Sequence, residues 1–441
     1  MNVAQLPATE LQPHFVIVVP KQFSDAIEKF VAHKNKQFAT ELVILEEVLA
    51  AKEGCDDAEK LKKFLFERWQ NKKCGYVLLV GDADVMPVRY MVLDRVTEPA
   101  FNYAFYPSDL YYSDLAKNDG SFESWNGTSD GFHQDYFGEV RGEANKKDPI
   151  NFDKIDYLPD VAVGRWPVST VDEVRVLVSK SLSHEARLGT SDRAALRKLA
   201  LFSVDGWVDS RPTLDRAAEL LGKSWSPERR YYGRWKGAQT AEPNEIEIKR
   251  LLNQGMGVVM HAGHGQDDRW EQCFPVTALK DIQNSDRLPI VLSAGCSTAR
   301  FATLPPYEAY EDVSGQEHVG TNLGEVFKEP PPPPACYQKG KYNPTGLGEQ
   351  LLRGGPNGAI AYIGCNTGSQ PCGLTLLVGF ADAYSKTKEP RLGDCWAGAV
   401  TFYHAEQRLN ELQPNADWYP PSIYFQAMKF MCYGDPTLPL P

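Results

Sequence analysis

Residues 258–265 read VVMHAGHG and residues 289–296 read PIVLSAGC. Each segment begins with the continuous apolar run of a buried strand and ends in a reactive side chain among small residues, His264 in the first and Cys296 in the second. In an open α/β sheet, chemistry takes place just beyond the carboxyl ends of the strands. If these two strands are neighbours, His264 and Cys296 face one crevice, as a cysteine nucleophile and its histidine base do. The stretch 257–301 therefore predicts an α/β sheet with a thiol-based site at its edge.

Glycines surround both reactive side chains. Gly263 and Gly265 flank His264, so the backbone can turn sharply and a substrate can come close. The backbone N–H groups of Gly265 and Cys296 are the expected donors to a developing oxyanion. Taken singly, His264 can equally be a polar residue at a strand end, and Cys296 a buried thiol, which is common for free cysteine. Their joint position at two strand ends favours catalysis.

Further segments carry a resemblance to a known family. They are residues 76–89 (YVLLVGDADVMPVR), 109–114 (DLYYSD), 159–167 (PDVAVGRWP) and 434–438 (GDPTL). Together with HAGHG at 261–265, the most specific element, they make the chain resemble the gingipain-type family of caspase-like cysteine peptidases of clan CD, over residues 15–440. The resemblance implies a caspase-like fold and a cysteine endopeptidase that cleaves proteins or peptides with a Cys296–His264 dyad. No organic cofactor is needed for this chemistry.

The sequence departs from the family pattern directly after the nucleophile. The family tends to have Cys-x-x-Gly-x-Phe, whereas residues 296–301 read CSTARF, with Ala299 in place of the glycine. The segment also differs from the Gln-Ala-Cys-x-Gly signature of true caspases. These departures concern the substrate loop after Cys296. They keep open an alternative function, a catalytically silent caspase-like scaffold or regulator that binds a partner protein.

The resemblance also implies an acidic residue that orients the catalytic histidine, and Asp205 is the residue that matches. It follows the predicted strand 198–204. A carboxylate bound to the second imidazole nitrogen fixes the tautomer of the ring. The alternative is an aspartate that caps the local structure before Gly206.

Substrate selection is a second role for an acidic group. Relatives in the clan cut after one kind of residue, often a charged one. An acidic side chain in the crevice would select Arg or Lys in the substrate through a charge-assisted hydrogen bond. Asp209 is the predicted selecting residue, with Asp215 behind it.

The chain has 441 residues, which is longer than one hydrophobic core usually serves. We expect two tandem caspase-like α/β subdomains, a non-catalytic one at 1–165 and a catalytic one at 166–441. Apolar runs predict strands at 14–20, 41–45, 76–80, 159–164, 198–204, 229–232, 257–261, 288–293 and 358–364. Helices are predicted at 21–33, 56–69, 171–187, 212–221, 243–253 and 391–412. Strands that alternate with helices predict parallel sheets flanked by helices.

The overall composition limits the partners and the location of the protein. A formal net charge of −11 argues against a nucleic-acid surface and against an anionic membrane surface. Nine scattered cysteines, an odd number, suit free thiols in a reducing compartment. Residues 1–14 lack the basic and apolar regions of a secretory signal, and no run is long enough to span a bilayer. We therefore expect a cytoplasmic protein without nucleic-acid or membrane partners.

Two segments lack the periodicity of regular elements. Residues 98–142 form an aromatic and acidic excursion, which predicts a long structured loop. Calcium takes several oxygen ligands from flexible loops, and the resemblance to gingipain-type domains favours a structural calcium ion here. The predicted ligands are Asp109, Asp114, Asp119 and Asp130. The alternative is a solvated acidic loop, because the spacing differs from that of an EF-hand. A run of five prolines predicts an extended loop at 329–344.

Other catalytic classes fit the sequence poorly. His261 and His264 read His-x-x-His, but metalloprotease pairs lie at i and i+4 on a helix. Gly263 and Gly265 argue against a helix here, so His261 is expected to be a buried strand residue. Ser297 lacks the Gly-x-Ser-x-Gly frame of a nucleophile elbow, which argues against a serine hydrolase.

Overall fold

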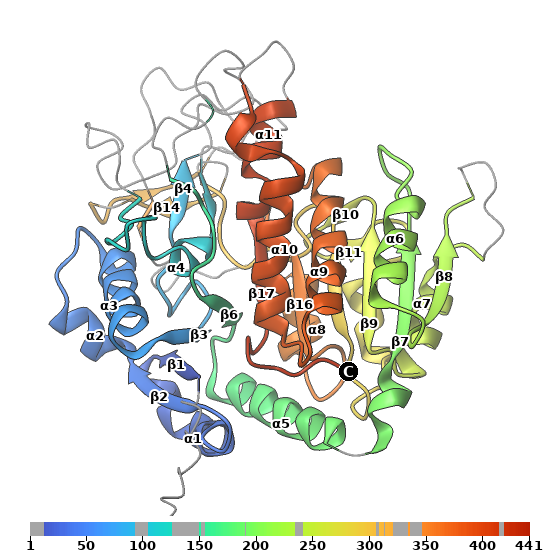
Figure 1. Ribbon diagram of the computed structural model, residues 1–441, viewed down its shortest axis with the longest axis horizontal. Coiled ribbons are helices and arrows are strands. Elements are labelled where there is room, and N and C mark those ends of the chain that lie inside the picture. Colours follow the sequence, from blue (N-terminus) through green and yellow to red (C-terminus); the bar gives the residue numbers. More distant parts are fainter. Residues whose placement is uncertain are drawn as a thin grey trace, which may run out of the picture.

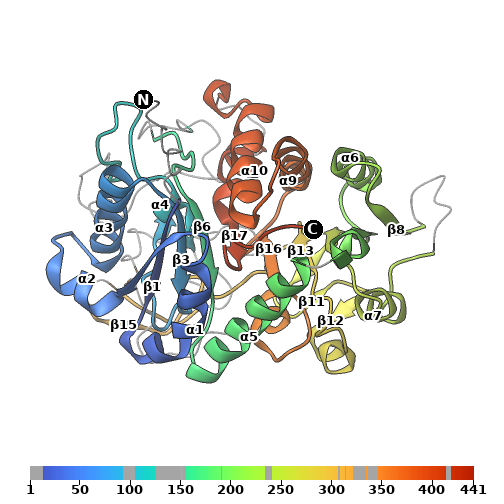
Figure 2. The same ribbon diagram turned by 60° about the horizontal axis from the view of Figure 1, so that its bottom comes forward.

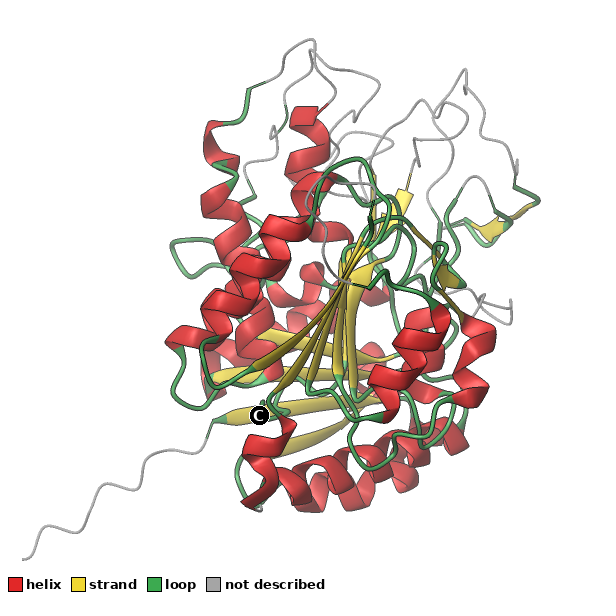
Figure 3. Cartoon of the chain, turned by 90° about the vertical axis from the view of Figure 1, so that its right-hand side faces the viewer, coloured by secondary structure: helices red, strands yellow, loops and turns green. Residues whose placement is uncertain are grey.

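A sheet of ten strands runs through the computed structural model, in the order β2-β1-β3-β6-β17-β16-β13-β9-β7-β8. The structure describes residues 13–92, 105–125, 150, 155–189, 191–233, 241–305, 308–312, 314–320, 334–335, 346–413 and 419–441. Helices cover both faces of the sheet (Figures 1 and 3). The expected α/β fold class is confirmed.

Every strand and helix predicted from the apolar pattern has a counterpart in the structure. The strands of the sheet are β1 (His14–Val19), β2 (Ala39–Ile44), β3 (Cys74–Val80), β6 (Ala162–Trp166), β7 (Lys198–Ser203), β8 (Ser226–Tyr231), β9 (Val258–Ala262), β13 (Ile290–Ser293), β16 (Ala361–Cys365) and β17 (Phe430–Tyr433). The matching helices are α1 (Ser24–Lys34), α3 (Asp57–Lys72), α5 (Val171–Leu188), α6 (Arg211–Leu221), α7 (Glu245–Asn253) and α10 (Leu392–Glu406). The sequence pattern missed β17, α2 (Leu45–Ala51), α8 (Leu347–Arg353) and α9 (Leu374–Lys386).

The strand β17 joins two groups of parallel strands that run in opposite directions. It is antiparallel to β16, where Ile363 pairs with Cys432, and parallel to β6, where Tyr433 pairs with Arg165. The other neighbouring strands of the sheet are parallel to each other. The carboxyl ends of β1 and β3 therefore lie at the opposite edge of the sheet from those of β9 and β13. Asp82, which follows β3, is thus far from the edge that carries the predicted dyad.

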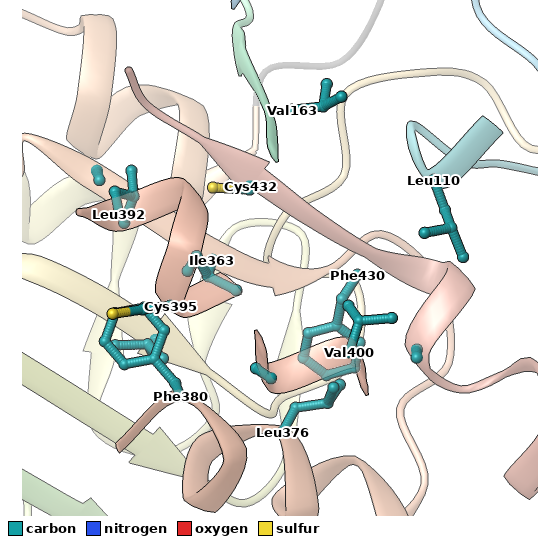
Figure 4. Close-up of a cluster of buried hydrophobic side chains, with 14 of the residues drawn as sticks. Leu110, Val163, Ile363, Leu376, Phe380, Leu392, Cys395, Val400, Phe430 and Cys432 are labelled. Atoms are coloured by element: carbon teal, nitrogen blue, oxygen red, sulfur yellow. The ribbon is translucent and has the colours of Figure 1, made fainter. Parts of the chain in front are cut away.

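Each face of the sheet has its own hydrophobic core, because side chains alternate along a strand. In β1, Val16 and Val18 belong to one core, and Phe15 and Ile17 belong to the other. The first core includes residues of α3, α6, α9 and α10, and the second includes residues of α1, α5, α7 and α8. Figure 2 shows α3, α6, α9 and α10 on one face of the sheet and α1, α5 and α7 on the other. Figure 4 shows part of the first core, where side chains of β16 and β17 meet those of α9 and α10.

The predicted boundary between the two subdomains falls inside β6. This strand pairs with β3 on one side and with β17 on the other. The end of the chain therefore returns to the middle of the sheet, where β17 lies between β6 and β16. The division at 165 and 166 stays a prediction.

Arg165 of β6 contacts three other segments that carry the family resemblance, namely 76–89, 109–114 and 434–438. Its fully buried guanidinium donates to both carboxylate oxygens of Asp109, at 2.7 and 2.6 Å, and to the carbonyl oxygen of Gly81 at 2.9 Å. Its own carbonyl oxygen accepts from the backbone N–H of Gly434 at 2.9 Å. A Cβ atom on Gly164 would lie 2.2 Å from the carbonyl oxygen of Gly434, so only glycine fits there. The segments that carry the resemblance therefore pack against one another and stabilise the fold.

Parts of the two predicted loops lie outside the described residues. Of the acidic excursion at 98–142, residues 105–125 are described, so Asp130 is not among them. Of the proline-rich loop at 329–344, only residues 334–335 are described. Within the described ranges, no helix is both long enough and apolar enough to cross a lipid bilayer.

Candidate active site

His264 and Cys296 lie beside the same cavity. Their strands β9 and β13 are parallel neighbours, and His261 is in register with Ser293. Both segments therefore leave the sheet at one edge and continue into loops that meet. A cavity of about 60 Å³ is lined by both residues and by segments that follow β7, β13 and β16. We call it the dyad cavity. The structure brings the predicted pair together as the sequence indicated.

The two loops of the site pack backbone against backbone. A Cβ atom on Gly265 would lie 3.0 Å from the carbonyl oxygen of Cys296 and 3.1 Å from Cα of Gly295. A Cβ atom on Gly295 would in turn lie 3.2 Å from Cα of Gly265. Side chains at either position would push His264 away from Cys296. The two glycines therefore allow the backbones of the two loops to approach each other closely. The proposed oxyanion contacts of Gly265 and Cys296 stay a prediction.

The sulfur of Cys296 contacts a loop that the sequence did not connect to the site. The backbone N–H of Ser369 donates to Sγ of Cys296 at 3.3 Å, and Sγ lies 3.5 Å from the carbonyl oxygen of Ser369. Burial raises the pKa of the Cys296 thiol, whereas the Ser369 N–H and the positive charge of Lys429 oppose this rise. The Ser369 N–H is placed to stabilise a thiolate.

Gln426 holds this loop in place. Its fully buried side-chain oxygen accepts from the backbone N–H of Gln370 at 3.0 Å, and its amide nitrogen donates to the hydroxyl of Ser369 at 3.4 Å. Gln426 follows α11 (Tyr419–Phe425), 130 positions after Cys296 in the sequence. No motif or spacing in the sequence pointed to it, because only the tertiary structure places it beside the site.

The loop after Cys296 is anchored despite its departure from the family pattern. Ser297 has a φ of +56°, so the chain turns sharply there. The backbone N–H of Ser297 donates to the carbonyl oxygen of Thr367 at 2.7 Å, and that of Ala299 donates to Cys365 at 2.9 Å. Ala299 is fully buried. An alanine at this position is therefore accommodated by packing against the end of β16.

His264 lies in a turn that touches the loop after β7. Gly263 has a φ of +142°, and a Cβ atom there would lie 2.1 Å from Cγ2 of Val204. The backbone N–H of His264 donates to the carbonyl oxygen of Asp205 at 2.9 Å. The carboxylate of Asp205 accepts from the backbone N–H of Gly206 at 3.0 Å, and the next helix, α6, begins only at Arg211, so this contact is not a helix cap. Its role in orienting the His264 ring stays a prediction.

His261 is the buried strand residue that the sequence predicted. Its ring stacks on Trp270, with centroids 4.6 Å apart and planes 6° apart. Its Nδ1 lies 2.9 Å from the hydroxyl oxygen of Ser293. Burial lowers the pKa of His261 to about 3, so the ring is neutral at physiological pH. These contacts give it a structural role beneath the site.

The acidic residues predicted to select the substrate already have basic partners. Asp209 receives two hydrogen bonds from Arg211, at 2.8 and 2.7 Å, and these lower the pKa of its carboxyl. Asp215 accepts from Arg229 at 2.7 Å and from the hydroxyl of Tyr231 at 2.8 Å. The described lining of the dyad cavity includes neither aspartate. Asp209 instead lines a neighbouring groove of about 530 Å³.

The predicted calcium ligands do not meet within the described residues. Asp109 forms the ion pair with Arg165, Asp114 accepts from Nε1 of Trp125 at 2.7 Å, and Asp119 accepts from its near neighbour Ser121. No group of three or more acidic, histidine or cysteine side chains in the described ranges is arranged to hold a metal ion. Calcium binding by the excursion stays a prediction.

A buried lysine contacts this acidic segment, and no pattern in the sequence pointed to it. Lys62 of α3 is fully buried, and its Nζ lies 4.4 Å from the ring centre of Tyr111 and 4.8 Å from that of Trp125. Burial lowers the pKa of Lys62 and raises that of Asp114, while their mutual attraction opposes both shifts. The amino group of Lys62 therefore lies over the rings of this segment, and burial weakens its hold on a proton.

Comparisons with known proteins place these features in context. Residues 8–441 match the family model described as peptidase family C25. Gingipain R2 of Porphyromonas gingivalis strain W83 is 20% identical over 295 residues, which cover 65% of this chain and 32% of that protein. An uncharacterized protein of Archaeoglobus fulgidus is 24% identical over 257 residues, covering 55% of this chain and 51% of that protein. The chain thus spans about a third of the gingipain R2 that it matches.

Solved structures share the fold. The crystal structure of the Arg-specific cysteine proteinase gingipain R superposes with a TM-score of 0.63 and 17% identity, over 99% of this chain and 80% of that one. The complex of the pro- and mature domains of Porphyromonas gingivalis RgpB has the same TM-score and identity, over 97% and 79% of the two chains. At this identity the likeness establishes the caspase-like fold alone.

Proposed function

This chain belongs to peptidase family C25, and we propose that it is a cysteine endopeptidase that hydrolyses peptide bonds with a Cys296–His264 dyad. The family is one of cysteine peptidases and the fold is that of gingipain. The observation that carries the proposal is the cavity shared by His264 and Cys296 at the end of two parallel strands. Its substrates would be proteins or peptides, and the dyad chemistry uses no organic cofactor.

The proposed reaction begins at the sulfur of Cys296. The thiol gives its proton to His264, and the thiolate attacks the carbonyl carbon of the scissile bond, so that a C–S bond forms and the carbonyl oxygen becomes negative. The N–H of Ser369 stabilises the thiolate before the attack. His264 then donates a proton to the leaving amine as the C–N bond breaks. Water, deprotonated by His264, hydrolyses the remaining thioester and restores the thiol.

Backbone groups supply the remaining stabilisation in this proposal. The N–H groups of Gly265 and Cys296 would hold the negative oxygen of the tetrahedral intermediate, since donors aimed at a developing charge lower its free energy. The close packing of Gly265 on Cys296 supports this assignment. Asp205, whose carbonyl oxygen binds the backbone of His264, would keep that loop in position.

A peptide probe with a thiol-reactive group tests the proposal directly. We expect it to label Cys296 of the folded protein, and we expect fluorogenic peptides to be cleaved by the same preparation. The Cys296→Ala variant should lose both signals. If the probe labels Cys296 no faster than the other cysteines and no peptide is cleaved, the protein is a caspase-like scaffold that binds a partner.

A further inference from the structure

We propose that the substrate side chain on the acyl side of the scissile bond is uncharged, either aliphatic or neutral polar, as in Val, Leu, Thr or Asn. The inference rests on the proposed function and names the substrate class for the same site. It replaces the expectation from sequence that an aspartate selects Arg or Lys. Two features of the dyad cavity carry it, and these are the charge of its wall and its exposed apolar rim.

The first feature is the charge of the cavity wall. Apart from the dyad, the wall consists of small, apolar and neutral polar residues. They are Gly206, Trp207, Val208, Ser210, Gly263, Ala294, Ser369, Gln370, Pro371 and Leu374. Within this described lining there is no carboxylate and no lysine or arginine. A charged substrate group that enters would lose water without gaining an opposite charge, which is strongly unfavourable.

Asp209, the predicted selecting residue, does not change this. Asp209 lies in the neighbouring groove, which shares Val208, Pro371 and Leu374 with the dyad cavity. A long basic side chain that reached over these residues would meet a carboxylate whose two oxygens already bind Arg211. It would have to break that pair in order to form its own.

The second feature is the apolar rim. Trp207 is 53% exposed and Val208 is 41% exposed, and they are adjacent members of a small group of large exposed apolar residues in the described structure. The Trp207 ring lies edge-on to His264, with centroids 6.2 Å apart. Exposed apolar side chains at a site indicate a surface that is covered by a ligand.

The neutral polar groups of the wall extend the range of acceptable substrates to amides and hydroxyls. Gln370 lines the cavity and carries a neutral side-chain amide. An amide group of this kind can pair with an amide or a hydroxyl of the substrate without any charge on either side. This is the reason for including Asn and Thr beside the aliphatic residues.

A panel of peptidyl acyloxymethyl ketones tests the inference. The peptides differ only in the residue next to the ketone, which is Val, Leu, Thr, Asn, Arg, Lys, Asp or Glu. In this probe the thiolate of Cys296 displaces the carboxylate leaving group, so the labelling rate of Cys296 by peptide mapping reports selection independently of turnover. We expect the neutral residues to label Cys296 at least tenfold faster than the charged ones.

Placing a carboxylate on the rim makes the test sharper. In Val208→Asp, the rate with Arg or Lys relative to that with Val should rise at least tenfold, because a charge-assisted hydrogen bond becomes available. Ile246→Asp is the matched control, since this residue of α7 is 75% exposed and is not part of the described cavity lining. It adds the same charge and should leave the ratio unchanged.

The outcomes separate the inference from the proposed function. Faster labelling by Arg, Lys, Asp or Glu in the unmodified protein would overturn the inference and leave the peptidase assignment intact. An equal change of the ratio in Val208→Asp and Ile246→Asp would also overturn it. If no member of the panel labels Cys296 faster than it labels the other cysteines, the proposed function fails and the inference fails with it.

Discussion

The backbone N–H of Ser369 donates to the sulfur of Cys296 at 3.3 Å, across 73 positions of sequence. The contact links the loop after β13 to the loop after β16. Gln426 fixes the second loop through both ends of its side-chain amide. The surroundings of the thiol are therefore built by residues from three distant parts of the chain.

Gln426→Met should reduce catalysis through the position of Ser369. The methionine keeps the length of the side chain but removes both hydrogen bonds, each worth about 1 kcal/mol. We expect kcat to fall about five- to tenfold with a smaller change in KM. The pH profile of Cys296 alkylation by iodoacetamide should shift to higher pH, because the thiolate loses its donor. A merely structural role would lower the amount of folded protein without moving that profile.

Two further variants complete this test. Gln426→Glu keeps an acceptor for the N–H of Gln370 and should lie between the methionine variant and the unmodified protein. Gln283→Met changes an exposed glutamine away from the described lining of the dyad cavity and should have no effect. An unchanged alkylation profile in Gln426→Met would show that Ser369 does not act on the thiol.

The two dyad residues should act as one unit. Cys296→Ala should lower kcat/KM at least about a thousandfold, and His264→Ala should have a comparable effect. Residues that work in one step show non-additive losses, so the double variant should be hardly worse than either single one. His261→Ala is the internal control, because this buried ring should affect the yield of folded protein and leave activity per folded molecule intact. Losses that add in the double variant would contradict a shared step.

Acid should destabilise the protein through His184. This side chain of α5 is buried, and its Nε2 has no partner within the described residues. Burial, together with the charges of Arg187 and Lys34, lowers the pKa of His184 to about 4. The neutral ring is favoured in the folded state, so its contribution is complete above pH 6.5 and is lost as the pH falls toward 4.

The measurement is urea unfolding at two pH values. Between pH 7.5 and pH 5, the His184 linkage should cost about 2 kcal/mol of unfolding free energy. His184→Phe should remove that part of the pH dependence. His404→Phe changes a half-buried ring and should remove a smaller part of the pH dependence of the unfolding free energy. The same pH dependence in His184→Phe and in the unmodified protein would rule out this linkage.

Asp109→Asn should destabilise the protein whether or not calcium is present. It removes the charge that faces the fully buried guanidinium of Arg165, and breaking a buried ion pair costs about 3 to 5 kcal/mol. Melting temperatures in millimolar calcium and in a chelator should fall equally. If the melting temperature of Asp109→Asn fell only in the presence of calcium, Asp109 would instead be a metal ligand.

The calcium proposal itself is tested by Asp119→Asn in the same series. Asp119 is exposed and bonds only to Ser121 in the described structure, so its loss should leave the melting temperature in chelator unchanged. If the excursion binds calcium through this side chain, the variant should lose a stabilisation by calcium, since a ligand raises the stability of the state that binds it.

The sequence by itself indicated the strands of the sheet and the position of His264 and Cys296 at one of its edges. Short apolar runs such as 14–20 and 288–293 indicate buried strands, because burying apolar surface dominates the free energy of folding and runs of this length are typical of strands. Parallel strands end at a common edge, so the runs before His264 and Cys296 were enough to place both residues beside one cavity. A local sequence pattern is enough to locate a strand, because the residues of one strand are consecutive in the sequence.

The tertiary structure alone decided what surrounds the dyad. The short strand β17 has no distinctive period, and its place between β6 and β16 follows from pairing partners that lie far away in the sequence. The same holds for the contact of Ser369 with Cys296 and for the support from Gln426. Asp209 had the right charge for a selecting residue, but its pairing with Arg211 depends on side-chain geometry that no sequence pattern encodes. Contacts between distant segments are set by the packing of the whole chain, and these contacts shape the dyad cavity.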